Sequence, residues 1–418
     1  PNEEPALSCF RQMASGLSAE PIDGGSFDLV VVGGGVAGTC ASLSAARLGL
    51  KVALVQDRPV LGGNNSSEVR VWLQGARNRE PYPRVGDVVR ELEQARAAHY
   101  GPANTADLYE DEKKLEVVRA EPNIQLLLLH RVNHVERDGP RMRAVLAQHI
   151  VTGERRRIAG RWFVDATGDG CVGYLAQADH ELTPTGHMGP CNLWNVMDTG
   201  SPVPFPRCPW ALDLADKPFP GRAKAFPGVP ADKRGIEVLG GWYWESGFDR
   251  HPIEEEEYVR DWNFRAMYGA WHTLKNVDGR YPNHRLNWAA YVAGKRESRR
   301  LLGDVVLTKD DVLGGKVFSD GCVPTGWKID LHLPDPRYEK GFEGDAFIAT
   351  AHFTGYPMPY WIPYRCLYSR NVLNLFMAGR DVSVTHEALG TVRVMRTGGC
   401  MGEIVGMAAA LCQQHQVD

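Results

Sequence analysis

A short apolar run that ends in closely spaced glycines constrains this chain more than any other feature of its sequence. Residues 27–38 read Phe-Asp-Leu-Val-Val-Val-Gly-Gly-Gly-Val-Ala-Gly, and a second apolar run follows at 52–55. A short β-branched run predicts a buried parallel strand. The small residues between the two runs predict a helix that starts at the glycines. The segment therefore predicts a strand, a helix and a second parallel strand.

The spacing of Gly33, Gly35 and Gly38 is typical of a dinucleotide-binding turn. Gly33 permits the tight turn, Gly35 lets the backbone approach a pyrophosphate, and Gly38 lets the helix pack closely on the strand. The phosphates are then expected at the helix N-terminus. Gln56 stands where an acid usually holds the ribose, and Asp57 follows it. Glutamine can also accept a hydrogen bond from a ribose hydroxyl. The alternative to a dinucleotide site is a βαβ unit that packs in this way without binding a ligand.

Length, charge and hydropathy exclude several classes of protein. At 418 residues the chain exceeds one ordinary core, so two domains are expected. A net charge of −4, with scattered Lys and Arg, argues against a nucleic-acid partner. Charged residues and glycines interrupt the apolar runs, so no membrane span is expected. A soluble protein is predicted, cytoplasmic or exported, because the chain starts at Pro1 without a visible signal peptide. The oligomeric state is not predicted.

The cysteines do not indicate a metal or redox centre. Nine are present, with no pair at C-x-x-C spacing. Zinc cages and redox dithiols usually have such pairs, so no metal site is predicted.

Hydrophobic periodicity predicts further elements along the chain. Apolar positions at helical spacing predict helices, and alternating or β-branched runs predict strands. Expected strands are 68–73, 123–129, a meander over 132–149 with a turn at Asp138-Gly139, and 161–165; expected helices are 85–98, one around 115–118, 252–275, 288–302 and 402–412.

The strand at 161–165 ends in Ala166-Thr167-Gly168-Asp169-Gly170, and here the chain resembles a known family. It is similar to the FAD-dependent oxidoreductases of the glutathione-reductase-like superfamily. The resemblance covers about 27–412, and its motifs occur in the order of the family. Besides the two glycine turns, the matching segments are 61–68 (Leu-Gly-Gly-Asn-Asn-Ser-Ser-Glu), 294–300 (Gly-Lys-Arg-Glu-Ser-Arg-Arg), 374–383 (Asn-Leu-Phe-Met-Ala-Gly-Arg-Asp-Val-Ser) and 391–395 (Thr-Val-Arg-Val-Met).

The resemblance implies an α/β fold. We expect a Rossmann-like FAD-binding domain, with a parallel sheet and a β-meander, into which a mixed α+β substrate domain is inserted. The expected divisions are an N-terminal extension (1–24), the first part of the FAD-binding domain (25–180), the substrate or cap domain (181–369) and the C-terminal part of the FAD-binding domain (370–418).

The resemblance also implies which residues hold the cofactor. The expected FAD contacts lie in the glycine turns, at the end of the second strand, in the meander and before the last helix. They are Gly33, Gly35, Val36, Ala37, Gly38, Gln56, Asp57, Arg58, Gly62, Gly63, Asn64, Asn65, Val132, Ala166, Thr167, Gly168, Gly379, Arg380, Asp381, Arg393 and Thr397. Members with a covalent flavin carry a histidine beyond the Gly-Gly pair. Because this chain has Ser66-Ser67 there, FAD is expected to bind non-covalently.

Three residues are candidates for chemistry on the substrate. His386, five residues after Asp381, is the first candidate for the base, although an isolated histidine can also be a core residue. His332 is the second, because alternation places it on one strand face with Asp330; a surface pair is the alternative. Arg365, in an aromatic segment, is a candidate clamp for a carboxylate, and a structural ion pair is its alternative.

The expected reaction is hydride transfer between flavin N5 and a polar, hydroxylated small molecule. A carbohydrate or sugar acid is the favoured substrate, because residues 181–275 are rich in Trp and Tyr, although such aromatics are more often core. The alternatives are reduction of an activated alkene, as in relatives of fumarate reductase with Arg365 and Arg393 as clamps, a redox-neutral sugar elimination or hydrolysis, and a non-catalytic flavin-binding protein. The electron acceptor is not predicted.

Overall fold

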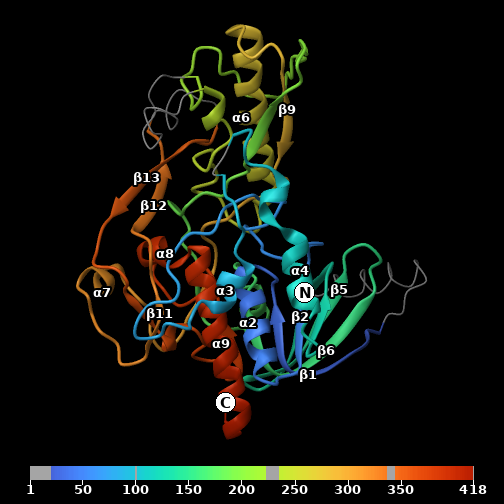
Figure 1. Ribbon diagram of the computed structural model, residues 1–418, viewed down its shortest axis with the longest axis vertical. Helices are drawn as coiled ribbons and strands as arrows, with labels where there is room; N and C mark the ends of the chain where they lie inside the picture. The colour runs from blue at the N-terminus through green and yellow to red at the C-terminus, as the bar shows by residue number, and fades with distance from the viewer. Residues whose placement is uncertain (1–19, 99–100, 223–234, 337–343, 418) are drawn as a thin grey trace.

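The computed structural model describes residues 20–98, 101–222, 235–336 and 344–417. Most of the predicted N-terminal extension therefore lies outside the described residues. Figure 1 shows a sheet flanked by helices in the lower half of the molecule, and a second part around a long helix, α6 (Glu256–His272), in the upper half.

The large sheet has seven strands in the order β3-β2-β1-β6-β5-β4, with β15 also paired to β6. Pairings of β1 with β2, β2 with β3, β1 with β6 and β6 with β15 are parallel, whereas β4, β5 and β6 form an antiparallel meander. The predicted α/β fold with a parallel sheet and a β-meander is confirmed. The strands are β1 (Ile22–Val32), β2 (Val52–Val55), β3 (Ile124–Leu127), β4 (His130–Asp138), β5 (Arg141–His149), β6 (Arg155–Asp165) and β15 (Leu375–Met377).

Helices cover the parallel part of the sheet, as expected for strands that are apolar on both faces. All four residues of β2 are buried, and so are Leu29 to Val32 of β1. In Figure 1, α2, α3 and α9 lie side by side on the sheet. The helices of this half are α2 (Val36–Arg47), α3 (Asp87–Leu92), α4 (Asp111–Arg119), α5 (Cys171–Leu175) and α9 (Met395–His415), with a 3₁₀ turn at Ala106–Tyr109.

Helices α2 and α9 cross at very short range because small residues face one another. A Cβ on Gly402 would lie 2.0 Å from the carbonyl oxygen of Ala37, and one on Gly406 would lie 2.6 Å from that of Ala41. Both glycines are in the helix interior, where glycine costs helix stability. Close packing of the two backbones therefore explains them.

The upper part has a hydrophobic core of its own. Trp194, Tyr243, Trp244, Trp262 and Trp271 are all buried in it. Most of the aromatic residues that suggested sugar binding are thus core residues. The elements of this part are β8 (Trp194–Asp198), a 3₁₀ turn (Gly235–Val238), α6, a short π-helix (Thr273–Val277) and β9 (His284–Ala289).

A third group of elements lies beside α9, on the left in Figure 1, and packs into the core of the large sheet. It includes the hairpin of β12 (Ile329–Pro334) and β13 (Ala349–Thr354), and also β7 (His180–Glu181), β10 (Arg300–Leu301), α7 (Lys309–Leu313), β11 (Gly321–Pro324), β14 (Trp361–Pro363), a 3₁₀ turn (Tyr364–Cys366) and α8 (His386–Val392). The predicted domain boundaries stay predictions.

Several predicted elements differ from the structure. Segment 68–73 is not a strand, because Arg70 has a φ of +64° and the backbone turns there. Residues 288–302 form no helix; Gly294 instead pairs with Cys191 in an antiparallel bridge. The helix predicted over 85–98 is shorter, at 87–92. The last helix starts at Met395 rather than at 402, with Gly398 and Gly399 inside it.

Candidate functional site

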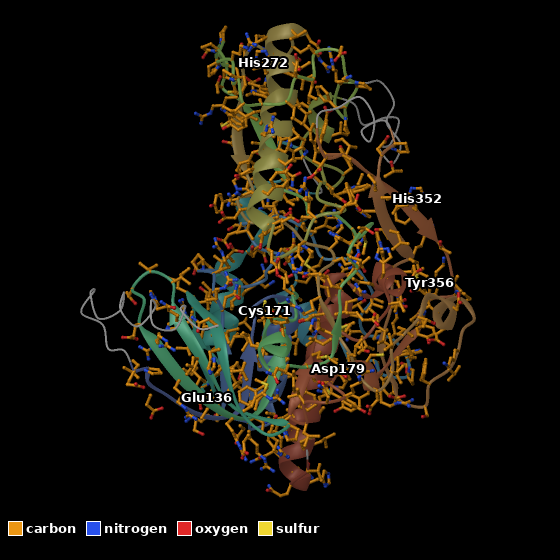
Figure 2. All side chains as sticks on the ribbon, turned by 180° about the vertical axis from the view of Figure 1, so that it is seen from behind. Glu136, Cys171, Asp179, His272, His352 and Tyr356 are labelled. Atoms are coloured by element: carbon orange, nitrogen blue, oxygen red, sulfur yellow. The ribbon has the colours of Figure 1, made fainter. Side chains whose placement is uncertain are left out.

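Four chain segments meet at the carboxyl edge of the parallel strands. The last residues of β1, β2, β6 and β15 are in register: Val32 lies opposite Val55 and Asp165, and Asp165 lies opposite Met377. The glycine turns that follow these strands therefore converge. They line one cavity of about 770 Å³, which continues to the β12–β13 hairpin and the start of α9. Figure 2 labels Cys171, a lining residue, near the centre of the molecule.

The first glycine turn has the shape that a dinucleotide needs. Gly33 has a φ of +104°, and a Cβ on it would lie 2.3 Å from the carbonyl oxygen of Ala166. A Cβ on Gly35 would meet only the Cα of Gly63, at 4.0 Å, so Gly35 borders open space. Gly35 is also the N-cap of α2, and no side chain caps this helix. Backbone N–H groups at the cavity edge are thus available to an anion such as a pyrophosphate.

Gln56 and Asp57, at the end of β2, both line the cavity. The Gln56 Oε1 accepts a hydrogen bond from the Gly34 N–H at 2.7 Å, and its Nε2 donates to the Val60 carbonyl at 3.2 Å. Gln56 therefore fixes the glycine turn. Asp57 also lines the cavity, and burial raises the pKa of its carboxyl, although Arg131 and Arg58 act against this.

Ion pairs join the second and third cofactor turns. Arg380 donates to Asp169 Oδ1 at 2.9 Å, and the Lys295 Nζ lies 2.8 Å from Asp169 Oδ2 and 2.9 Å from Glu256 Oε2. Burial would raise the pKa of Asp169, but Lys295 and Arg380 outweigh it and hold this pKa well below its usual range. Asp169 therefore stays ionised, with two cations beside it on the cavity wall.

Most of the predicted cofactor residues line this cavity. They are Gly33, Gly35, Val36, Ala37, Gln56, Asp57, Arg58, Gly62, Gly63, Asn64, Val132, Ala166, Thr167, Gly168, Gly379, Arg380 and Arg393.

Gly38, Asn65, Asp381 and Thr397 are not among the lining residues, so their cofactor contacts stay predictions. A Cβ on Gly38 would lie 1.9 Å from the Gly33 oxygen, which makes this glycine a packing residue. The Asn65 amide donates to Val71 and Gln94, and the Thr397 hydroxyl donates to Pro324.

Asp381 is fully buried beside the carboxylate of Asp165. Burial and the charge of Asp165 raise the pKa of Asp381 well above its usual range. Its Oδ2 accepts a hydrogen bond from the Gly170 N–H at 3.3 Å. Asp381 therefore joins two of the glycine turns from behind, away from the cavity.

At the other end of the cavity, His332 is held by two carboxylates. Its Nδ1 lies 2.6 Å from Glu245 Oε1, and its Nε2 lies 3.2 Å from Asp330 Oδ1. His332 and Asp330 line the cavity, whereas Glu245 lies behind them and is fully buried. The predicted placement of Asp330 and His332 on one strand face is confirmed. Glu245 fixes the imidazole at Nδ1 and leaves Nε2 on the side of Asp330.

Arginines and tryptophans surround this pair. Arg393 donates to the backbone oxygen of Asp330 at 3.0 Å and lies 3.4 Å from its Oδ2, and Trp327 Nε1 donates to Oδ2 at 3.1 Å. Burial would raise the pKa of Asp330, but His332 and Arg393 hold it well below its usual range. The ring of Trp242 lies 4.8 Å from that of His332.

Arg296 pairs with the carboxylate behind His332. Its Nη2 lies 2.9 Å from Glu245 Oε1, and it also donates to the Trp242 carbonyl at 3.0 Å. Each of the two buried arginines is therefore matched by one carboxylate, so their charges cancel within this wall. We call His332, Asp330, Arg393, Arg296, Trp242 and Trp327 the polar wall of the cavity.

His386 and Arg365, two of the three predicted catalytic residues, lie elsewhere. Neither is among the residues that line the cavity. His386 Nδ1 lies 2.8 Å from Glu297 Oε2, a buried carboxylate that also binds Arg300. Arg365 forms a two-pronged ion pair with Asp320, at 2.9 and 3.0 Å. Both side chains thus form ion pairs away from the cavity, and their roles as base and clamp stay predictions.

Sequence reasoning missed Glu245, Lys295, Arg296, Trp242 and Trp327 as site residues. Arg296 and Lys295 lie in a segment that carries the family resemblance, and this was their only signal. Glu245 is the one acid in the aromatic run 242–248, and a lone buried acid is a signal that was available.

Among the described residues, no group of three or more His, Cys, Asp or Glu side chains is placed to hold a metal ion. Within the same part of the chain, no helix has the length and apolarity that crossing a membrane requires.

The chain is similar to known proteins of one family. A family model described as FAD dependent oxidoreductase matches residues 28–418. Glycerol-3-phosphate dehydrogenase of Mycobacterium leprae is 46% identical over 54 residues, which are 13% of this chain and 9% of that protein. The match thus spans less than a tenth of that relative.

Solved structures show more distant likenesses. The quinol fumarate reductase subunit FrdA of E. coli is 14% identical, with a TM-score of 0.41 over 94% of this chain and 71% of that chain. A geranylgeranyl bacteriochlorophyll reductase-like protein from Thermoplasma acidophilum is 11% identical, with a TM-score of 0.44 over 94% of this chain and 79% of that chain.

Proposed function

This chain belongs to the FAD dependent oxidoreductase family and is an FAD-dependent enzyme; from this premise, we propose that it oxidises a hydroxylated small molecule, a carbohydrate or sugar acid, held against the polar wall. The cofactor turns at one end of the cavity and the polar wall at the other support this division into an FAD end and a substrate end. We also propose that FAD is bound without a covalent link.

The observation that carries the proposal is the Glu245–His332 pair. When bound, FAD takes up a hydride from carbon at flavin N5. The hydroxyl proton of the same carbon must leave as the carbonyl forms. The substrate hydroxyl takes the place next to Nε2 that Asp330 Oδ1 holds here at 3.2 Å, and His332 Nε2 accepts the proton. Glu245, at 2.6 Å from Nδ1, orients the ring and stabilises its positive charge. Imidazole with a buried carboxylate at its far nitrogen is a common arrangement for a base.

The rest of the polar wall suits hydroxyl groups. Trp327 Nε1 and Arg393 Nη2 donate to Asp330 and hold it in place. Asp330 Oδ1 and Arg393 Nε make no hydrogen bond within the described part of the chain, and Trp242 offers a flat apolar face. Mixed acceptors and donors next to aromatic faces are what a ring with several hydroxyls can use. Proton transfer to His332 and hydrogen bonds to neighbouring hydroxyls thus occur on one wall.

Reduction of an activated alkene is less well supported. It would need cationic clamps for the substrate carboxylates. Arg365 lies outside the cavity, and Arg393 and Arg296 are each paired with a carboxylate of the wall. A dicarboxylate would therefore meet Asp330 as well as the arginines. A neutral or singly charged hydroxylated substrate fits this balance of charge better.

Anaerobic flavin reduction tests the proposal. The FAD-loaded enzyme is mixed with a panel of sugars and sugar acids, and loss of flavin absorbance is followed. The chemically reduced enzyme is mixed with enoates, and return of the absorbance is followed. We expect bleaching by a sugar or sugar acid. His332→Asn should slow it by about 100-fold or more, since a general base contributes roughly that much.

Two control variants separate the candidate bases. His352→Asn, an exposed histidine on β13, should bleach at the rate of the unchanged enzyme. His386→Asn should also bleach at the rate of the unchanged enzyme, because the His386 side chain pairs with Glu297 away from the cavity. A full loss in His386→Asn with no effect in His332→Asn would overturn the assignment. An enoate cannot reduce oxidised flavin, but it can reoxidise reduced flavin. Reoxidation of the reduced enzyme by an enoate, together with no bleaching of the oxidised enzyme by any sugar, would favour the reductase.

A further inference from the structure

Two exposed aromatic side chains lie at the edge of the cavity. Phe353 and Tyr291 both line the cavity, yet they are 53% and 64% exposed. Large hydrophobic side chains that line a cavity and remain this exposed must lie at its mouth. Exposed apolar surface at a binding site usually marks a contact with ligand.

The register of the β12–β13 hairpin connects Phe353 to the polar wall. Phe353 is directly opposite Asp330, and Ala351 is directly opposite His332. Directly opposite residues of an antiparallel pair share one face of the sheet, with Cβ atoms about 4.5–5.5 Å apart. The face that carries Asp330 and His332 into the cavity therefore carries Phe353 as well.

Burial changes abruptly along this face. Asp330 is 6% exposed and His332 is 4% exposed, whereas Phe353 is more than half exposed. Ala351, opposite His332, has only a methyl side chain, which does not fill the space beside the His332 ring. The buried polar residue Asp330 and the exposed aromatic residue Phe353 are thus neighbours on adjacent strands. Figure 2 labels His352, the neighbour of Phe353, at the periphery of the molecule.

Tyr291 lies at a different part of the cavity edge, near Arg58 of the cofactor end. Its hydroxyl accepts a hydrogen bond from Arg260 Nη1 at 2.9 Å, and the Arg260 guanidinium lies 4.6 Å from the ring centroid. Tyr291 is therefore not part of the surface that continues the polar wall.

From these observations we propose an outer subsite, formed by Phe353, for a second ring attached to the sugar that is oxidised. The substrate class is then a glycoside, in which the inner sugar meets His332 and Asp330 and the outer ring stacks at the mouth. A sugar ring with an apolar face and an aromatic aglycone share this chemistry. The inference rests on the proposed function.

The outer subsite is tested by varying the number of rings in the substrate and by removing the Phe353 side chain. Flavin reduction is measured anaerobically for methyl glycosides, disaccharides and p-nitrophenyl glycosides of whichever sugar bleaches the enzyme. We expect kcat/KM to be higher for the two-ring compounds. Stacking on one aromatic ring contributes roughly 0.5–1.5 kcal/mol, so Phe353→Ala should remove about 2- to 10-fold of that advantage. Kinetics with the methyl glycoside should not change.

The comparison of disaccharide and aryl glycoside shows which outer ring is preferred. Trp210→Ala is the control, because Trp210 is a similarly exposed aromatic that does not line this cavity.

The outcomes separate the two proposals. Equal kcat/KM for one-ring and two-ring compounds, or an equal loss for both in Phe353→Ala, would overturn the subsite and leave the oxidation of sugars intact. If no sugar or glycoside bleaches the flavin, and none binds to the FAD-loaded enzyme by calorimetry, both proposals fall together.

Discussion

The imidazole of His332 takes its orientation from Glu245, a carboxylate that lies outside the cavity. Glu245 also pairs with Arg296, so one buried acid positions two members of the polar wall. Glu245 touches no substrate in our proposal and is a positioning residue. Its effect should therefore appear in the rate of proton transfer rather than in the binding of substrate.

For this reason Glu245→Gln should lower kcat by about 10- to 100-fold with little change in KM. The amide can still accept from Nδ1–H, but it cannot stabilise a charged ring or neutralise Arg296. Stopped-flow flavin reduction measures the rate. Glu245→Asp, which keeps the charge, should recover part of it, and a purely structural role would not give this recovery.

A matched control is Glu257→Gln, the same chemical change at an exposed cavity residue away from the polar wall. It should leave kcat near the value of the unchanged enzyme. A loss as large as that of Glu245→Gln would contradict the positioning role.

Gln56 stands where an acid is usual, and its hydrogen bonds show why an acid would not serve here. A glutamate could still accept from Gly34, but a second carboxylate oxygen would face the Val60 carbonyl, where the amide now donates. Gln56→Glu should therefore destabilise the apo-protein by about 1–3 kcal/mol, the usual effect of an unsatisfied buried polar group. It should not tighten FAD binding.

Thermal unfolding of the apo-protein and FAD titration by flavin fluorescence measure these two quantities. Gln414→Glu, on the exposed end of α9, is the control and should be neutral. Tighter FAD binding by Gln56→Glu with unchanged stability would show that Gln56 contacts the ribose directly.

Glycine turns were the most predictable part of the site, because their requirement is local. Gly33 and Gly35 act through backbone conformation and access, which spacing in the sequence reveals. His332 was predicted only because its strand alternates. Glu245, 87 residues away along the chain, was not predictable, since only the packing of the upper part on the β12–β13 hairpin brings it to His332.

The crossing of α2 and α9 rests on backbone contact, so it tolerates no additional atoms. Gly402→Ala would bring a methyl group within 2.0 Å of the Ala37 carbonyl oxygen. Alanine favours a helix by about 1 kcal/mol over glycine. Overpacking costs about 1–3 kcal/mol and often more. We expect the clash to dominate, so that Gly402→Ala lowers the free energy of unfolding and weakens FAD binding through α2.

Chemical denaturation and FAD titration check this expectation. Gly355→Ala is the control, because a Cβ there would meet no atom within 4 Å and its φ is not positive. A Gly402→Ala protein as stable as this control would mean that the helices can move apart at no cost.

Elements with strong periodicity were predictable, and elements shaped by long-range contacts were not. The strands that became β1, β2 and β6 have continuous apolar runs, and these runs are buried. In contrast, the alternation at 68–73 arises because Val69 and Leu73 are buried in an irregular segment that Arg70 turns. The glycines at 398 and 399 suggested a helix start, but α9 uses them for close contact, since a Cβ on Gly399 would lie 2.5 Å from Val89.

The two halves of the molecule are joined at the cavity by Lys295. Its Nζ contacts Asp169 below and Glu256 of α6 above, and its backbone oxygen accepts a hydrogen bond from Asn64. Lys295→Met should therefore loosen the two halves. Breaking a buried ion pair costs about 3–5 kcal/mol, and Arg380 remains to neutralise Asp169, so the loss should fall near or below the lower value.

Thermal unfolding and limited proteolysis of the apo-protein measure this loss. Lys316→Met, which removes an exposed lysine from a single ion pair with Asp311, should change stability by less than about 1 kcal/mol. Equal melting of both variants would show that Lys295 does not join the halves.

The parallel edge of the sheet is completed by β15, a strand of three residues that follows β6 by more than 200 positions and pairs with it at Asp165. During translation, β1, β2 and β6 leave the ribosome long before Gly379, Arg380 and α9 do. Until β15 is synthesised, the carboxyl end of β6 lacks the partner strand that β15 provides, and the cavity lacks Gly379 and Arg380. The complete nucleotide cradle therefore forms only after residues 379–380 and α9 have been synthesised, more than 200 positions after β6.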